Sequence, residues 1–236
     1  MLRVASFHLV RERHAVVALA RLGLDRRRLR RTPGLLFWRL LGTGSGSDTG
    51  PGADLRRTAL FAVWRDEAAL DAFAASMAPR RTRSVEYYEV RLRAASGHGA
   101  WRGTDVIGML PPGDRPVVPA PVAIITRADV HLRAWPAFRA AGGPVSEELA
   151  GADGLLAVVG IGEAPMGRLG TFSLWRDIAA ARAFASGQPE HREVVRRTRA
   201  ERWYGEELFA RFEPYASSGS WDGRDPLRDI IGTSIP

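Results

Sequence analysis

The chain of 236 residues contains neither cysteine nor lysine. The absence of cysteine excludes disulfide bonds, thiolate nucleophiles, cysteine-ligated zinc, iron–sulfur clusters and a thiolate-ligated haem iron. No apolar run approaches the roughly 18 residues that are needed to span a bilayer. The N-terminal residues show no long apolar segment with a small-residue cleavage site, so we expect no signal peptide and a cytoplasmic location.

Because lysine is absent, all 34 basic residues are arginine, and the net charge is +8. The densest basic run is DRRRLRR, at residues 25–31. Neither interleaved aromatic residues nor a recognisable nucleic-acid-binding motif accompanies this run, so we expect no nucleic acid partner. Basic faces of this kind suit an acidic protein that donates electrons, or anionic lipid headgroups, and peripheral contact with a membrane surface remains open.

The pattern of apolar residues predicts one order of elements that occurs twice. In the first half we expect strands at 3–10, 35–41, 58–64 and 85–95 and helices at 14–24 and 66–77, the second helix capped by Asp66. In the second half we expect strands at 121–130, 154–161, 170–175 and 208–217 and helices at 132–141, 177–186 and 191–204. Glycine-rich stretches at 42–53 and 97–120 are expected to be loops.

Sequence repeats support a duplication. FAVWRD at 61–66 aligns with FSLWRD at 172–177, and GAWRG at 99–103 aligns with GSWDG at 219–223. A β-α-β-β-α-β unit is ferredoxin-like, with helices on one face of its sheet only, so a second sheet has to cover the open face. We therefore predict an α+β fold in which tandem ferredoxin-like repeats form a fused α/β barrel of the dimeric type. Residues 1–105 and 121–217 are the expected halves, 106–120 the connector and 218–236 a tail.

The two halves differ in one expected helix. The helix at 191–204 begins with His191, contains several arginines and has no counterpart in the first half. A histidine at the start of a helix is most often a solvated surface residue. Trp64 and Trp175 occupy equivalent positions of the repeat, which favours a structural role for both.

Several segments resemble the spheroidene monooxygenase family of carotenoid 2-oxygenases. These segments are PGLLFWRLLGTG at 33–44, GIGEAP at 160–165, TFSLW at 171–175, RAERWYGEELFARF at 199–212 and WDGRDPL at 221–227. The resemblance is collinear over most of the chain. It implies a haem-dependent monooxygenase that uses O2 and an external electron donor such as ferredoxin to oxidise a small apolar substrate, either a carotenoid or a secondary metabolite.

The resemblance also implies site residues. Related barrels in chlorite dismutases, dye-decolorising peroxidases and aldoxime dehydratases bind haem through a histidine of the C-terminal half, which makes His191 the expected iron ligand, with His8 the second choice. Arginine pairs well with carboxylates, so Arg192 and Arg196 are expected to bind the haem propionates. The stretch at 42–56 is longer and more polar than the family pattern, which leaves the identity of the substrate open.

Apolar walls for a long substrate are expected from Trp175, Phe172 and Ile161, although aromatic strand residues of a barrel are usually ordinary core. Glu163 is a candidate polar group of the distal side, or else a solvated turn residue. Arg168 is a candidate to hydrogen-bond a ligand of the iron.

Two rival functions remain. The first is a haem-dependent lyase or dehydratase on the same barrel that acts on an N–O bond of an aldoxime-type substrate. The second is a cofactor-free barrel that binds a small hydrophobic ligand. The sequence contains no G-x-S-x-G, H-E-x-x-H or Walker motif. It leaves open whether the protein is a monomer or a homodimer.

Overall fold

The computed structural model describes residues 2–44, 53–111, 120–163, 167–187, 196–198 and 200–231. The first half contains β1 (Val4–Arg11), α1 (Ala15–Leu29), β2 (Leu35–Gly44), β3 (Ala53–Trp64), α2 (Glu67–Ser76), α3 (Ala78–Arg83) and β4 (Glu86–Gly99). The second half contains β5 (Val122–Val130), the short 3-10 helix η1 (Leu132–Ala134), α4 (Trp135–Ala150), β6 (Leu155–Gly162), β7 (Arg168–Trp175), α5 (Ile178–Gly187) and β8 (Tyr204–Gly219), and α7 (Arg228–Ile231) follows.

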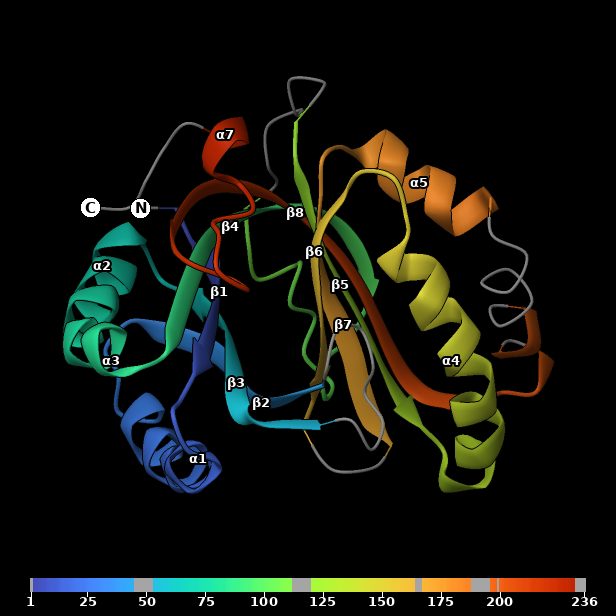
Figure 1. The fold of residues 1–236 in the computed structure, drawn as a ribbon, viewed down its shortest axis with the longest axis horizontal. Coiled ribbons are helices and arrows are strands. Elements are labelled where there is room, and N and C mark those ends of the chain that lie inside the picture. Colours follow the sequence, from blue (N-terminus) through green and yellow to red (C-terminus); the bar gives the residue numbers. More distant parts are fainter. Residues whose placement is uncertain are drawn as a thin grey trace.

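The strands form one closed antiparallel barrel in the order β1-β3-β2-β6-β7-β5-β8-β4 (Figure 1). Each half contributes four consecutive strands of this order, which is the arrangement expected of two ferredoxin-like sheets. A long seam joins β4 to β8, whereas β2 meets β6 only where Gly42 pairs with Gly162 and Thr43 with Ile161. Helices α1 to α3 cover the outer face of the N-terminal sheet, and α4 and α5 cover that of the C-terminal sheet (Figure 1). The predicted fold class is confirmed.

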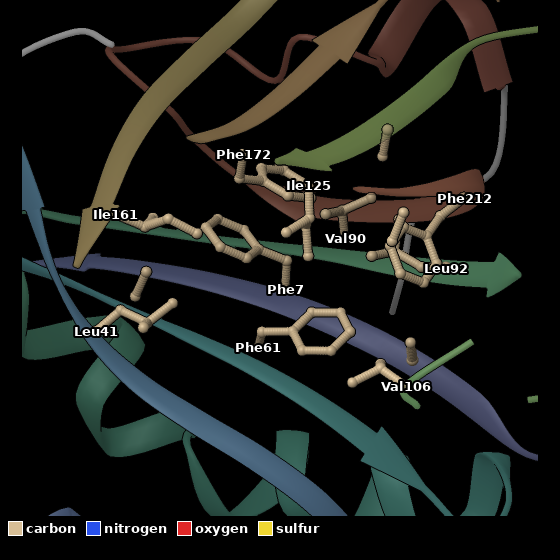
Figure 2. Close-up of a cluster of buried hydrophobic side chains, with 14 of the residues drawn as sticks. Phe7, Leu41, Phe61, Val90, Leu92, Val106, Ile125, Ile161, Phe172 and Phe212 are labelled. Carbon is tan, nitrogen blue, oxygen red and sulfur yellow. The ribbon is translucent and has the colours of Figure 1, made fainter. Parts of the chain in front are cut away.

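The interior of the barrel is an apolar core built from both sheets. Figure 2 shows Phe7 of one sheet facing Phe172 of the other, and their ring centroids are 3.8 Å apart. The two repeated tryptophan turns complete this core, because Trp101 stacks on Phe61 and Trp221 stacks on Phe172. Close-packed side chains fill protein interiors at the density of organic crystals. The barrel interior therefore serves as the structural core that holds the two sheets together.

The cap of α2 and the packing of the two repeated tryptophans agree with the predictions from the sequence. Asp66 accepts a hydrogen bond from the backbone N–H of Ala69 at 2.9 Å and so caps α2. The indole of Trp64 donates to the hydroxyl of Ser6 at 2.8 Å, and the indole of Trp175 donates to that of Ser173 at 2.9 Å. Both tryptophans are buried against their own helices, which confirms a structural role.

Some predicted boundaries are wrong, for identifiable reasons. Helix α1 continues past residue 24 to Leu29, because nothing interrupts it before the Thr-Pro-Gly turn at 32–34, and the arginine run is therefore largely helical. Strand β4 continues to Gly99 because it pairs with β8 along its whole length, so part of the expected loop at 97–120 is strand. Helix α4 continues to Ala150, beyond the expected end at residue 141, and Pro136 lies in its first turn, where a missing N–H is harmless. Tyr204 begins β8 rather than ending a helix.

Candidate active site

A row of mostly small residues crosses the helix-facing side of the C-terminal sheet. Thr171 pairs with Gly160 on one side and with Thr126 on the other, Thr126 pairs with Phe209, and Phe209 pairs with His98. Directly paired residues of antiparallel strands point to the same face of a sheet. These five residues are called the open row below. Thr126 is exposed although β5 lies between β7 and β8, so the space in front of it is not filled by the covering helices.

Apolar clusters lie on both sides of the open row. On one side, Trp175 and Val122 of the sheet pack with Leu149 of α4 and Ala181 of α5. On the other side, the cluster contains Ala128, Val130, Ala134 and Trp203, with Trp135, Phe138 and Tyr204 packed against it. Helices α4 and α5 are thus anchored to the sheet by apolar contacts, and two threonine hydroxyls lie on the floor between these contacts. The exposed Thr126 therefore lies between two apolar clusters, a setting that suits a largely apolar ligand.

Two arginines, Arg211 of β8 and Arg182 of α5, lie near each other on this side of the sheet. The guanidinium of Arg211 lies 5.1 Å from the ring centroid of Phe209 in the open row. Burial lowers the pKa of Arg211, and the positive charge of Arg182 on α5 lowers it further. Within the described part of the chain, neither arginine forms an ion pair with a carboxylate. A charged group that is partly buried beside a like charge is disfavoured unless an anion binds there.

Histidines are distributed between the two halves. His98 is exposed at the end of the open row and stacks on Phe209 at a centroid distance of 5.7 Å. His8 is buried in the N-terminal half, where Nε2 lies 2.8 Å from the Ser6 hydroxyl and Nδ1 lies 3.1 Å from the Tyr87 hydroxyl. Burial lowers the pKa of His8 to about 4, so it is neutral at pH 7. His191 and Arg192 lie outside the described residues, and Arg196 is exposed on a helical segment.

Glu163 and Arg168 lie at the hairpin between β6 and β7. The backbone N–H of Glu163 donates to the carbonyl of Arg168 at 3.0 Å. The Glu163 carboxylate accepts from the indole of Trp101 and forms ion pairs with Arg39 at 3.2 Å and with Arg102 at 3.5 Å. Its interpretation as a solvated turn residue is therefore wrong, because three partners hold it between the two halves. Arg168 is exposed.

Comparison with known proteins places the chain in a family. No family model matches it. It is 34% identical over 212 residues to the spheroidene monooxygenase of Rhodobacter capsulatus, an alignment that covers 88% of this chain and 87% of that protein. It is also 34% identical to the spheroidene monooxygenase of Rubrivivax gelatinosus, with 81% and 73% of the two chains covered. The chain belongs to the spheroidene monooxygenase family. Membership of this family makes it an oxygenase.

Solved structures agree on the fold. An aldoxime dehydratase matches 90% of this chain and 82% of its own at a TM-score of 0.55, with 13% sequence identity. An aldoxime dehydratase in complex with butyraldoxime matches 99% and 86% at a TM-score of 0.58, with 10% identity. At such low identity the likeness concerns the fold alone.

The three expected wall residues of this spheroidene monooxygenase family member do not lie together. Phe172 and Ile161 point into the barrel interior, whereas Trp175 points to the helix side of the same sheet. Neighbouring residues on a strand alternate between faces, so a pocket on the helix side can include Trp175 but not Phe172. Sequence reasoning did not single out Thr126, Thr171 or Arg211. For Thr171 the sequence repeat did contain a signal, because this threonine aligns with the apolar Leu60. Recognising that the difference marks an open position requires knowing which strands are neighbours in the sheet.

Among the described residues, no helix combines the length and apolar character that crossing a membrane requires.

Proposed function

We propose that the chain is a haem-dependent monooxygenase that oxidises an apolar, carotenoid-like substrate in the space in front of the open row. The observation that carries the proposal is the combination of a small-residue floor with an exposed Thr126, flanking apolar clusters and an arginine pair that has no ion-pair partner among the described residues. The names of the curated relatives, all spheroidene monooxygenases, support oxygenation of a carotenoid-like molecule.

Haem is a flat apolar ring system with two carboxylates, and the residues present suit such a ligand. The exposed Thr126 leaves room in front of the sheet, and its row neighbours Thr171 and Gly160 carry small side chains. Arg182 and Arg211 would pair with the propionates, which removes the like-charge repulsion between them. Arg192 and Arg196 are further propionate partners implied by the family resemblance.

The iron ligand in this proposal is His191, and His98 is the described histidine in the open row. When bound, haem supplies an iron that can activate O2 with electrons from an external donor such as ferredoxin. The protein's own contribution is to hold the ligand by imidazole and arginine, and to exclude water with the clusters around Trp175 and Trp203. The hydroxyls of Thr126 and Thr171 can donate hydrogen bonds from the open row.

The test is spectroscopic first and catalytic second. The protein is expressed with haem supplied, purified, and its absorption measured before and after dithionite. We expect close to one haem per chain, a Soret band that shifts on reduction, and O2 uptake that depends on both a reductant and an acyclic carotenoid. Absence of stoichiometric haem after reconstitution would contradict the proposal. Haem without O2 uptake, combined with turnover of an aldoxime, would favour the lyase alternative.

Two variants assign the ligand. We expect His191→Ala to lose haem or to change its spectrum, and His98→Ala to keep both. If His191→Ala binds haem with an unchanged spectrum while His98→Ala does not, the ligand is His98 and the haem proposal stands. If both variants are unchanged, neither histidine is the ligand.

A further inference from the structure

Helix α1 has an unusual exposed side. Val16, Leu19 and Leu24 are 71%, 51% and 66% exposed, and all three are large apolar side chains. At 3.6 residues per turn they share one side of the helix, opposite the buried Ala18 and Leu29. Single exposed apolar residues are common, but three on one helix side are an apolar surface that needs an explanation.

The same side of α1 continues into basic residues. Arg26, Arg27 and Arg30 are exposed, and within the described residues none of them has an ion-pair partner. The helix's own carboxylate, Asp25, is turned inward, where it accepts a hydrogen bond from Arg80 at 2.6 Å. The exposed side of α1 therefore combines apolar side chains near its start with an uncompensated positive charge near its end.

We propose that this side of α1 binds the surface of an anionic lipid bilayer. An interfacial helix inserts apolar side chains to the depth of the headgroup and acyl boundary, while its arginines contact lipid phosphates. Long arginine side chains can reach the headgroups while the helix backbone lies flat on the surface. The inference rests on this surface alone and is independent of the proposed function.

Charge by itself would equally fit a nucleic acid or an acidic protein. The exposed Val16, Leu19 and Leu24 argue against nucleic acid, because phosphate backbones offer no apolar surface to cover them. An anionic bilayer offers both a charged surface and an apolar interior, and an acidic protein is the alternative that the experiments below test. Helix α1 also contains no aromatic residue on which nucleic-acid bases could stack. Binding to lipid therefore has to depend on both halves of the surface, the apolar one and the basic one.

The first experiment is co-sedimentation of the full chain with vesicles. Equal parts of phosphatidylcholine and phosphatidylglycerol are compared with pure phosphatidylcholine. We expect binding to the anionic vesicles that weakens as salt rises, and at least tenfold weaker binding to the neutral ones. The triple variants Val16→Ser/Leu19→Ser/Leu24→Ser and Arg26→Gln/Arg27→Gln/Arg30→Gln should each weaken anionic-vesicle binding by tenfold or more.

Matched controls carry the same substitutions elsewhere. Leu2→Ser/Val85→Ser removes exposed apolar residues at 72% and 61% exposure away from α1. Arg83→Gln/Arg133→Gln/Arg139→Gln removes three exposed arginines from other helices and leaves the same net charge as the α1 variant. We expect both controls to bind like the parent. If the control variants lost as much vesicle binding as the α1 variants, the effect would come from overall charge or solubility, and the proposal would be overturned.

A second measurement uses the absence of cysteine. A single Leu19→Cys, labelled with an environment-sensitive fluorophore, reports only from the exposed side of α1. We expect a blue shift with anionic vesicles, and no shift from Val85→Cys carrying the same label. No shift at position 19, or a shift with an oligonucleotide or an acidic protein but not with vesicles, would overturn the proposal.

Discussion

The two halves of the barrel use the same layer between sheet and helices in opposite ways. In the N-terminal half, Leu60 pairs with Leu40 on one side and with His8 on the other, and all three are buried. The repeat aligns Leu60 with Thr171, whose partners Gly160 and Thr126 are small and, for Thr126, exposed. The first layer, called the closed layer below, is lined by large buried side chains around a small cavity. The second, called the open layer, has small side chains at these positions and an exposed Thr126.

The packing of helices against the sheet also differs between the two layers. In the N-terminal layer, the ring of Phe73 from α2 packs edge-on against the ring of His8 at a centroid distance of 5.5 Å, and both line a small cavity. Fully burying a leucine side chain contributes about 1.5–3 kcal/mol, so the C-terminal half forgoes that stabilisation at the aligned positions. The comparison teaches that two layers of equivalent topology differ in a few side chains, and that these side chains decide which layer is filled by leucine and histidine and which keeps the space proposed for a ligand.

The largest expected effect comes from replacing the threonines of the open row with leucine, the residue that stands at the aligned position 60 of the N-terminal layer. In Thr126→Leu/Thr171→Leu, extra methyl groups occupy the space proposed for haem, and overpacking costs about 1–3 kcal/mol for each change. We expect haem affinity to fall by about a hundredfold or more, since every 1.4 kcal/mol is tenfold. The melting temperature of the haem-free protein should hold or rise. Haem titration and thermal unfolding provide both measurements.

The reverse exchange is the control. Leu60→Thr removes buried methyl groups from the N-terminal layer, so it should lower stability by about 2–4 kcal/mol without changing haem affinity. If the leucine double variant of the open row bound haem like the parent, the proposed site would be the wrong location. If Leu60→Thr alone lost haem, the two layers would not be independent.

Much of this fold could be predicted from the sequence. Alternation in the strands, the capping aspartates and the repeated tryptophan turns are local signals, and they are sufficient for two ferredoxin-like sheets. The ends of α1 and β4 were missed because helix continuation and pairing with β8 are set by neighbours rather than by the segment itself. Propensity gives way to tertiary contacts at such boundaries.

The site was harder to predict, again for a physical reason. Phe172 and Trp175 stand three residues apart on one strand, yet they face opposite sides of the sheet, and only the closed barrel shows which side is core. Arg211 lies in a family-like segment, but the like charge beside it is there only because α5 brings Arg182 nearby. Such a repulsion is a property of the packed structure, and the spacing of residues along the sequence does not reveal it.

The closed layer should also carry a pH dependence, because it contains a buried histidine. The pKa of His8 is lowered from 6.5 to about 4 mainly by burial. As pH falls through this window, the unfolded chain takes up the proton before the folded one does. Stability is therefore lost between about pH 6.5 and 4, by about 3 kcal/mol at about 1.4 kcal/mol per pH unit.

Urea unfolding of the parent and of His8→Gln at several pH values measures this contribution. Glutamine keeps hydrogen-bonding capacity toward Ser6 and Tyr87 but does not titrate. We expect the loss of stability across this window to be about 3 kcal/mol smaller in the variant, whereas exposed His14→Gln should follow the parent. The Glu89 carboxylate, whose pKa is lowered partly by His8 and partly by Arg81 and Arg91, loses stability in the same direction, and the variant removes the His8 part of that effect. Parallel curves for parent and His8→Gln would contradict the assignment.

The smallest effect expected in this series, and the most specific, concerns the arginine pair of the open layer. In Arg211→Gln, a propionate partner is lost, and a charge-assisted hydrogen bond at a partly exposed site is worth about tenfold in haem affinity. The haem-free protein should become more stable, because the substitution removes a desolvated charge that Arg182 repels. A decrease in haem affinity together with an increase in stability would indicate that Arg211 serves a ligand rather than the fold.

Arg133→Gln is the matched control, because it removes an exposed arginine near α4 without touching the sheet. It should change neither haem affinity nor melting temperature by a measurable amount. If Arg211→Gln lowered both quantities together, Arg211 would be a structural residue with an unrecognised partner. If it raised stability and left haem affinity unchanged, the uncompensated charge would serve another anion, and the propionates would bind elsewhere in the proposed site.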